Sequence, residues 1–347
     1  MSLTVLNIII HNYYEELNDD NRLFGQQCSE LGDDLLAPFA ALRLAAKKVG
    51  CNVGTISSIT LQDASAIIFI DMPDPRKTLV REMLNSGVPL YLMVFESILV
   101  RPIDRDLNFL SRFERIFTYN DSLVDDHHYV KINYSFLLPR AIQFDLAKKT
   151  KFCVLIASNK RANSECELYS KRIEVIRWFE KNRPDEFDLF GLGWDQHHFG
   201  NQFPFRFLNR FTNLRRALSP HYPSYRGPVV RKAPVFERYK FALCFENVRD
   251  VPGYITEKIF DCFFAGCVPI YWGASNISNY IPDSCFIDYT KFDSIEDLYE
   301  FLANMDSRSY GLYISNIENF VSGFKSSPFS LDCFVDTVLN TILNREA

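Results

Sequence analysis

The sequence predicts an α/β protein with two doubly wound parallel sheets, and three observations lead to this fold class. First, 347 residues are enough for about two domains, each with its own apolar core. Second, short apolar runs alternate with helical stretches in both halves, as in βαβ units. Third, a polar and basic segment at 139–151 separates the halves and is interpreted as a linker. We therefore expect domains at 1–145 and 152–325, followed by a tail at 326–347.

Each predicted element follows from its own stretch of sequence. Uninterrupted apolar runs of strand length predict buried strands, and they lie at 5–10, 66–70, 90–95, 115–119, 152–157, 187–190, 241–245 and 268–272. Apolar residues at helical spacing predict helices at 35–49, 78–85, 166–181 and 256–265. Glycine follows three of these helical stretches, as expected where helices end. The tail at 330–346 has the same spacing, which predicts a final helix that can pack back on the first domain.

Composition and charge exclude several classes of protein. Hydrophobic residues make up 47% of the chain and aromatic residues 15%, which excludes an intrinsically disordered protein. The 38 basic and 43 acidic residues give a net charge of −5, so there is no general electrostatic case for a nucleic-acid partner. No apolar run approaches the length that spans a bilayer, and we expect peripheral membrane association at most.

The densest group of polar residues lies between residues 239 and 273. A buried strand runs into Glu246 and Asn247, a Pro-Gly loop follows, and a helix begins near Thr256. A helix N-terminus beyond the carboxyl end of a parallel strand favours an anion, so this region predicts a phosphate site. Lys258 can supply charge to a diphosphate, while Glu257 and Asn247 can bond to ribose hydroxyls. The alternative is that Thr256 only caps the helix and the next two residues are solvated.

The whole segment closely resembles the donor-binding signature of the family 10 α-1,3/4-fucosyltransferases. The motifs that carry this resemblance are Tyr239-Lys-Phe, Phe245-Glu-Asn, Tyr254-Ile-Thr-Glu-Lys and Val268-Pro-Ile-Tyr-Trp-Gly. Shorter matches occur in the family's order over nearly the whole chain: Phe95-Glu-Ser, Phe117-Thr-Tyr-Asn-Asp, Ile156-Ala-Ser-Asn, Arg172, Phe187-Asp-Leu-Phe-Gly and Phe286-Ile-Asp. The resemblance implies a GT-B fold, with an N-terminal Rossmann-like acceptor domain and a C-terminal Rossmann-like domain for GDP-fucose.

The resemblance also implies a set of donor-binding residues. Arg172 and Lys258 resemble the diphosphate ligands, and the remaining donor contacts are Asn247, Tyr254 and Glu257. The predicted donor set is completed by Ser158, Asn159 and Glu246. For Glu246 there is a structural alternative, because a carboxylate at a strand end can simply hold the neighbouring loop.

Inverting transfer requires a base that accepts the proton of the acceptor hydroxyl. Glu96 follows a strongly apolar strand in the first half and matches the family's Phe-Glu-Ser motif, so we expect it to be the catalytic base. Its structural alternative is a strand-end carboxylate that bonds to a loop.

No metal site is expected. Asp104-Arg-Asp106 resembles the metal motif of another glycosyltransferase fold, but it lies in the first half, away from the donor signature. The histidine pairs at 127/128 and 197/198 have adjacent side chains that point apart. We therefore expect that no cofactor is required and that Mg²⁺ or Mn²⁺ is at most stimulatory. The aromatic stretch at 199–211 is predicted to pack in the core, with contact to sugar rings as the alternative.

These observations together predict an inverting glycosyltransferase that moves L-fucose from GDP-β-L-fucose to a glycan acceptor, in an α-1,3-type linkage to GlcNAc or a similar sugar. Surface glycan or lipopolysaccharide synthesis is the expected setting. Nine cysteines without a C-x-x-C pair and a short N-terminal apolar run favour the bacterial cytoplasm, with at most peripheral contact at the inner membrane. A trimmed Golgi luminal domain is the alternative. Two other functions stay open, namely the same fold with another GDP-sugar and a catalytically inactive GDP-sugar- or glycan-binding protein.

Overall fold

The first half of the chain forms a parallel α/β domain in the computed structural model, which describes residues 5–25, 34–97, 99, 107–125, 127–142, 144–197, 199 and 205–343. Within these residues its sheet has six parallel strands in the order β2-β1-β3-β4-β5-β6. The strands are β1 (Leu6–Asn12), β2 (Cys51–Gly54), β3 (Ala66–Ile70), β4 (Leu90–Val94), β5 (Arg115–Thr118) and β6 (Tyr129–Lys131). The helices are α1 (Ala37–Lys48), α2 (Thr78–Leu84) and the short α3 (Leu107–Leu110).

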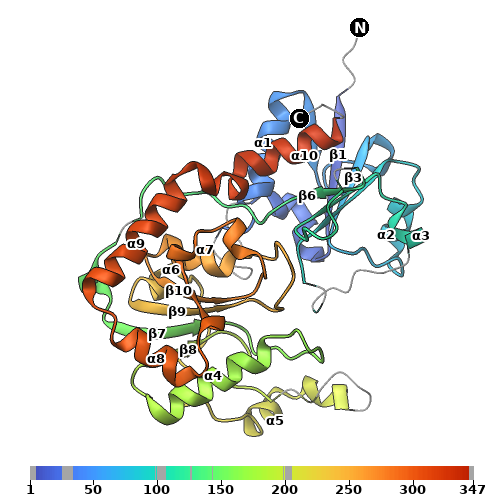
Figure 1. Ribbon diagram of the computed structural model, residues 1–347. Helices are drawn as coiled ribbons and strands as arrows, with labels where there is room; N and C mark the ends of the chain where they lie inside the picture. Colours follow the sequence, from blue (N-terminus) through green and yellow to red (C-terminus); the bar gives the residue numbers. More distant parts are fainter. Residues whose placement is uncertain are drawn as a thin grey trace.

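The second half forms another parallel sheet below the first in the view of Figure 1. Its described strands run in the order β11-β10-β9-β7-β8 and pair in parallel throughout. They are β7 (Lys151–Ile156), β8 (Phe187–Phe190), β9 (Tyr239–Phe245), β10 (Val268–Trp272) and β11 (Ile287–Asp288). The helices are α4 (Tyr169–Asn182), α5 (Thr212–Ala217), α6 (Ala233–Phe236), α7 (Glu257–Phe264), α8 (Ile295–Ala303), α9 (Ser307–Ser322) and α10 (Leu331–Ile342). The predicted fold class, with two parallel-sheet domains, is confirmed.

The strands that the sequence analysis missed are the short ones at sheet edges. β2 is interrupted by the polar residue Asn52 and ends in a glycine, and β6 and β11 have only 3 and 2 residues, so none of the three shows an apolar run. The helix ends differ from the predicted ones by a few residues. The helix expected from 166 begins at Tyr169, since the Glu167 carboxylate accepts from the backbone N–H of Ser170. Ser330 and Thr256 cap α10 and α7 through their hydroxyl oxygens.

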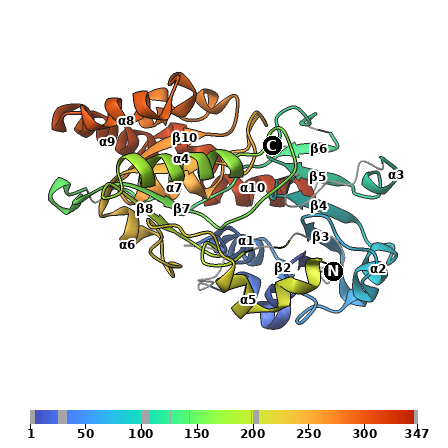
Figure 2. The ribbon, with the colours of Figure 1, turned by 90° about the horizontal axis from the view of Figure 1, so that it is seen from below.

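The C-terminal helix α10 packs on the first domain. Figure 1 and Figure 2 both place it beside α1. Its residues Phe334, Val335, Val338 and Leu339 belong to the same core cluster as β1, β3 and α1. Four buried apolar side chains, each worth about 1.5–3 kcal/mol of burial, hold the last helix across the domain boundary.

Residues 200–204 of the aromatic stretch lie outside the described residues, and the phenylalanines at 205, 207 and 211 do not pack in the core as expected. Phe205, Phe207 and Phe211 are 57%, 52% and 48% exposed. Phe207 and Phe211 pack against each other, with ring centroids 5.4 Å apart, and the Arg210 guanidinium lies over the Phe207 ring. Phe199 donates its backbone N–H to Asn209. An apolar run in an irregular segment has no periodicity that indicates which side is buried. Its burial could therefore not be predicted from the sequence.

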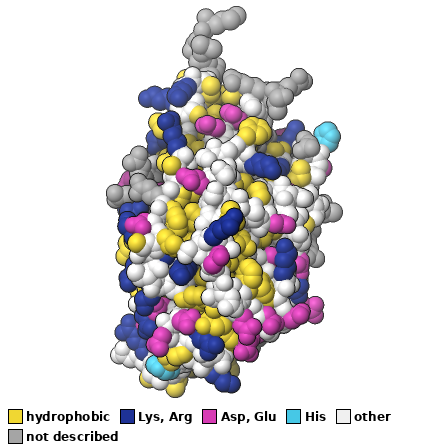
Figure 3. All heavy atoms as spheres, turned by 60° about the vertical axis from the view of Figure 1, so that its left-hand side comes forward, with side chains coloured by type: hydrophobic (Ala, Val, Ile, Leu, Met, Phe, Trp, Pro, Cys, Tyr) yellow, Lys and Arg dark blue, Asp and Glu magenta, His cyan; other side chains and the backbone are white. Residues whose placement is uncertain are grey.

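Figure 3 shows one face of the molecule, on which charged side chains of both signs are mixed. Apolar side chains lie between them. Among the described residues, no helix has the length and apolar character needed to cross a membrane.

A polar contact joins the two domains beside the loop that leads to α7. Asp121 follows β5, and its carboxylate accepts hydrogen bonds from Tyr280 (2.6 Å), Asn276 (2.7 Å) and Lys131 (2.5 Å). Burial opposes the charged form of Asp121, but these three donors lower its pKa below the ordinary value. Asn276 in turn accepts from the backbone N–H of Gly253 at 2.8 Å. This network fixes the second-domain loop against the first domain.

Replacing Gly253 with alanine is expected to destabilise the protein by about 2 kcal/mol or more. Gly253 has a φ of +79°, and an added Cβ would lie 2.2 Å from the Tyr119 carbonyl oxygen. Gly50 is the matched control, because its φ is +78° and an added Cβ would meet nothing within 4 Å. The melting temperatures of both variants are compared with that of the wild type. The loss at Gly50 reports backbone strain alone, and any additional loss at Gly253 reports the clash between the domains. Equal losses of stability at the two positions would show that the domains do not press together at Gly253.

Candidate functional site

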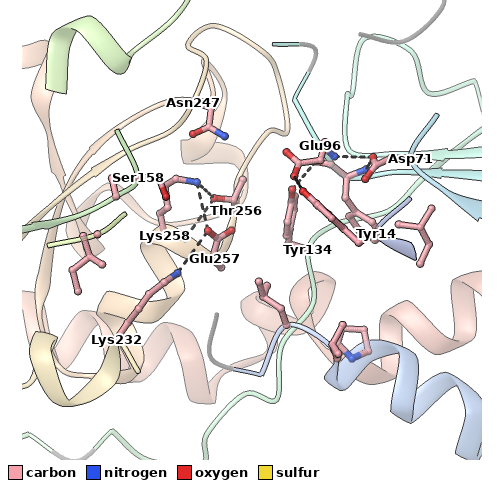
Figure 4. A pocket seen from close by; sticks show the side chains of 18 of the residues that line it. Tyr14, Asp71, Glu96, Tyr134, Ser158, Lys232, Asn247, Thr256, Glu257 and Lys258 are labelled. Atoms are coloured by element: carbon pink, nitrogen blue, oxygen red, sulfur yellow. Dashed lines mark hydrogen bonds and ion pairs between the residues drawn. The ribbon is translucent and has the colours of Figure 1, made fainter. Parts of the chain in front are cut away.

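A cleft of about 400 Å³ lies between the domains, at the carboxyl ends of both sets of strands. This position is where open parallel sheets bind their ligands. The first domain lines it with residues that follow β1, β3 and β4 and with the start of α1: Asn12, Tyr14, Asp71, Phe95, Glu96, Leu36 and Phe39. The second domain lines it with residues that follow β7, β8 and β9 and with the start of α7: Ser158, Lys160, Leu192, Asn247, Thr256, Glu257 and Lys258. Figure 4 shows the two groups facing each other.

Arg172 lies on α4, and its side chain lines the second-domain side of the cleft. Only 3% of Arg172 is exposed. One terminal nitrogen, Nη2, donates to the carbonyl oxygens of Phe245 (2.6 Å) and Glu246 (2.8 Å) and to Oδ1 of Asn247 (3.1 Å). Burial lowers the pKa of Arg172, yet a guanidinium stays protonated at neutral pH.

The charge of Arg172 is not matched by a carboxylate in contact with it. No ion pair within 4 Å involves Arg172 among the residues that the structure describes, and its buried Nε has no hydrogen-bond partner there. A buried charge is costly unless a counter-charge accompanies it. A guanidinium held in this way at the wall of a cleft is suited to bind an anion.

Lys258 belongs to an ion-pair network at the start of α7. Its Nζ lies 3.2 Å from Oε2 of Glu246 and 3.6 Å from Oε1 of Glu257. Burial opposes the charged form of Lys258, but the two carboxylates outweigh it and raise the pKa of Lys258 above its ordinary value. Burial also opposes the charged form of Glu257, yet the ammonium groups of Lys258 and Lys232 lower the pKa of Glu257 to about 2. Both Lys258 and Glu257 are therefore charged at neutral pH.

Three further residues of the predicted donor set line the cleft. Ser158 follows β7, and Asn247 follows β9 and is fixed by Arg172. Tyr254 is only 1% exposed, and its ring packs on that of Tyr119 in the first domain, 4.8 Å away. Burial holds the pKa of Tyr254 well above its ordinary value. Tyr254 thus contributes a neutral hydroxyl and a contact between domains.

Two predicted donor residues lie outside the cleft lining. The carboxylate of Glu246 is fully buried and accepts from the backbone N–H and the hydroxyl of Thr256, both at 2.8 Å. Burial raises the pKa of Glu246. Asn159 donates to the carbonyl oxygen of Gly193 at 3.1 Å. Both side chains hold loops in place, which for Glu246 is the structural alternative that the sequence left open.

Glu96 stands at the carboxyl end of β4, on the first-domain side of the cleft. It is half-buried, and its Oε1 accepts a hydrogen bond from the Tyr14 hydroxyl at 3.3 Å. In Figure 4 its carboxylate lies at the edge of the first domain, on the side that faces Thr256 and Asn247. The fold thus brings a carboxylate from one domain opposite the cationic group of the other, as predicted.

Asp71 and Lys232 are among the cleft residues that the sequence analysis missed. Asp71 follows β3 and lies beside Glu96, and the rule for strand ends predicts polar residues of this kind. Lys232 precedes α6, and its Nζ bonds to Asp261 at 2.7 Å and approaches Glu257 at 3.8 Å. No motif marks Lys232, because it lies just before the first motif of the donor signature, at the start of the short helix α6.

The residues that the structure describes contain no group of three or more His, Cys, Asp or Glu side chains that could hold a metal ion. Asp104 and Asp106 lie outside these residues, as does His198. The expectation that no metal is required therefore stays a prediction.

Comparison with known proteins agrees with this geometry. Residues 146–315 match the model of the family described as "Glycosyltransferase family 10 (fucosyltransferase) C-term". An alpha-(1,4)-fucosyltransferase of Arabidopsis thaliana is 40% identical over 77 residues, which cover 22% of this chain and 19% of that protein. The alpha-(1,3)-fucosyltransferase FucT of Helicobacter pylori is 33% identical over 98 residues, which cover 27% of this chain and 20% of that protein. The aligned segments thus span about a fifth of these relatives.

Solved structures show the same fold over nearly the full chain. A crystal structure of an alpha1,3-fucosyltransferase matches with a TM-score of 0.60 at 13% identity, covering 99% of this chain and 92% of that one. Anabaena Alr3699/HepE, solved with UDP and glucose, matches with a TM-score of 0.56 at 11% identity, covering 98% and 100%. The two facing parallel-sheet domains form a GT-B fold. The family match covers the domain that carries Arg172, Asn247 and Lys258, so residues 146–315 belong to glycosyltransferase family 10, the fucosyltransferase family.

Proposed function

We propose that this protein transfers L-fucose from GDP-β-L-fucose to a hydroxyl group of a glycan acceptor, with inversion at the anomeric carbon. The observation that carries the proposal is the buried guanidinium of Arg172, which lines the cleft without an ion-pair partner among the described residues and lies on the wall opposite Glu96. One wall thus offers a site for an anionic leaving group and the other offers a base. The match of residues 146–315 to the fucosyltransferase family supports GDP-fucose as the donor.

The second domain holds the donor in this proposal. The diphosphate lies against Arg172 and Lys258, near the N-terminus of α7, where the helix dipole adds to the positive potential. The remaining donor contacts come from Ser158, Asn247, Tyr254 and Glu257, which line the same wall. Related crystal structures of an alpha1,3-fucosyltransferase contain GDP and GDP-fucose, which supports this choice of donor.

The first domain holds the acceptor and supplies the base. As the acceptor oxygen bonds to the anomeric carbon, the bond from that carbon to the diphosphate oxygen breaks, and the electron pair leaves with GDP. The proton of the acceptor hydroxyl passes to the Glu96 carboxylate. Arg172 and Lys258 stabilise the charge that develops on the leaving diphosphate. Because base and leaving group lie on opposite walls of the cleft, attack occurs on the face opposite GDP, which gives inversion.

The acceptor and the setting are part of the same proposal. We infer an α-1,3-type linkage to GlcNAc or a similar sugar, during synthesis of a bacterial surface glycan or lipopolysaccharide. The linkage is supported by the relatives named alpha-(1,3)-fucosyltransferases. We place the reaction in the bacterial cytoplasm, with at most peripheral contact at the inner membrane. The eight described cysteines are free thiols and six of them are buried, a usage typical of reducing compartments.

A screen of GDP-sugars against a glycan array tests the proposal. Transfer from GDP-fucose to an acceptor with a free GlcNAc hydroxyl is the expected result, and the anomeric configuration of the product reports inversion. Transfer from a different GDP-sugar only would overturn the choice of fucose while keeping the fold and the GDP site. Binding of GDP without turnover of any GDP-sugar, in the presence or absence of acceptor, would identify a binding protein instead of an enzyme.

Transfer is expected to continue when divalent cations are removed. Arg172, Lys258 and the start of α7 already supply positive charge at the diphosphate site, so the leaving group can be stabilised without a metal. The measurement compares initial rates in EDTA with rates in Mg²⁺ or Mn²⁺. A stimulation of a few-fold is compatible with this mechanism. Complete loss of activity in EDTA that added metal restores would contradict it.

A further inference from the structure

The backbone that carries Glu96 is held by side chains from three other elements. The backbone N–H groups of Phe95 and Glu96 both donate to Oδ1 of Asp71, each at 2.9 Å. The carbonyl oxygen of Phe95 accepts from the Tyr134 hydroxyl at 2.5 Å, and that of Glu96 accepts from the Tyr119 hydroxyl at 3.3 Å. All four polar groups of this short segment beyond β4 are therefore fixed by side chains.

The position and backbone conformation of Asp71 allow this contact. Asp71 directly follows β3, which pairs with β4, and its own N–H donates to the carbonyl oxygen of Met93 at 2.8 Å. Its φ of +59° lies in the left-handed region, which Asp and Asn tolerate better than most residues. Asp71 is only 5% exposed. Its carboxylate accepts hydrogen bonds from the two N–H groups that follow the neighbouring strand. Figure 4 shows Asp71 behind Glu96, on the side away from the second domain.

We propose that Asp71 is a positioning residue, which orients the Glu96 carboxylate by fixing the two peptide groups that carry it. The inference rests on the proposed function, because it assigns Asp71 a role through the base of that reaction. Hydrogen bonds to a carboxylate are stronger than those between neutral groups, so Asp71 restrains the Phe95 and Glu96 peptides more firmly than a neutral acceptor would. A displacement of about 1 Å in a reacting group can lower a rate by about 10²-fold, which gives this restraint a measurable effect.

Three substitutions separate the acceptor role of Asp71 from its charge and its backbone. Asp71→Asn keeps an oxygen acceptor and tolerates the positive φ, so turnover is expected to fall by less than about fivefold. Asp71→Gly tolerates the φ without strain but removes both hydrogen bonds, so turnover at saturating substrate is expected to fall by about 10²-fold. Asp71→Ala adds backbone strain to the same loss. GDP affinity should stay within about twofold in all three, because the donor lies on the other wall.

A double-substitution cycle with Glu96→Gln shows whether Asp71 acts through the base. In the Glu96→Gln background, Asp71→Gly is expected to change the remaining rate by less than about twofold, because there is no base left to orient. A loss of about 10²-fold in both backgrounds would overturn the assignment, as would equal losses in Asp71→Asn and Asp71→Gly.

A crystal structure of Asp71→Gly tests the inference without any activity. Reoriented Phe95 and Glu96 peptides are expected, and unchanged peptides would overturn the proposal. If the wild-type protein fails to transfer fucose, the proposed function fails by itself, and this structural comparison still decides whether Asp71 fixes Glu96.

Discussion

Glu96→Gln is expected to lower the rate of fucose transfer by about 10²- to 10⁴-fold, or about 3–5 kcal/mol of barrier, while GDP binding stays at the wild-type level. The amide keeps the shape of the side chain and can still accept the hydrogen bond from Tyr14, which is 3.3 Å from the carboxylate oxygen. It cannot accept the proton of the acceptor hydroxyl. Because Arg172 and Lys258 lie on the other domain, the donor site is not altered by the change.

The measurement pairs turnover with GDP affinity on the same purified variant. Glu82→Gln is a matched control, because Glu82 is exposed on α2, away from the cleft lining, and undergoes the same chemical change. If Glu96 only braced its loop, the substitution would lower the melting temperature and leave turnover per folded molecule nearly unchanged. That result would remove Glu96 as the base and make Asp71 the next carboxylate of the first domain to examine.

The sequence was informative about the sheets because buried parallel strands are continuous apolar runs. Strands such as β3, β4 and β9, which are buried over nearly their whole length, stand out without any structural knowledge. The edge strands β2, β6 and β11 do not, because each is either interrupted by a polar residue or only two or three residues long. The predicted packing of Phe205, Phe207 and Phe211 was wrong, since an irregular aromatic segment has no periodicity that indicates which of its sides is buried.

Site residues could be predicted from the sequence where the residue type and its motif suggested a single role. Lys258 and Asn247 both belong to the donor signature and line the same wall of the cleft. Glu246 was ambiguous, because a carboxylate at a strand end can face a ligand or hold a loop. Only the structure shows that it bonds to Thr256 at 2.8 Å and is fully buried. Asp71 and Lys232 were missed because the contacts that give them a role join segments far apart in the chain.

GDP is expected to stabilise the wild-type protein against heat, and substitution of Lys258 is expected to remove most of this effect. A ligand at a hundred times its dissociation constant adds about 2.7 kcal/mol to the free energy of unfolding. Lys258→Met keeps much of the aliphatic side chain but removes the charge that we assign to the diphosphate. Lys48→Met, on the exposed surface of α1, is the control for the loss of a lysine.

Lys258 also forms an ion pair with Glu246. The experiment must therefore distinguish the loss of this ion pair from the loss of GDP binding. The Nζ of Lys258 is 3.2 Å from the fully buried carboxylate of Glu246, and removing one partner of a buried ion pair typically costs about 3–5 kcal/mol. The single variant is therefore expected to melt lower than wild type even without GDP. A double variant, Glu246→Gln with Lys258→Met, removes both charges and should recover much of this stability.

The double variant makes the prediction decisive. If Lys258 binds the diphosphate, the double variant folds well and still shows little stabilisation by GDP, because the missing cation is not restored. If Lys258 serves only to neutralise Glu246, the double variant regains both its melting temperature and its full GDP shift. The same comparison applies to Arg172→Lys, which keeps a positive charge but cannot reproduce the fixed guanidinium that donates to the carbonyl oxygens of Phe245 and Glu246. Its GDP shift should fall between those of the wild type and Lys258→Met, since charge is kept and geometry is lost.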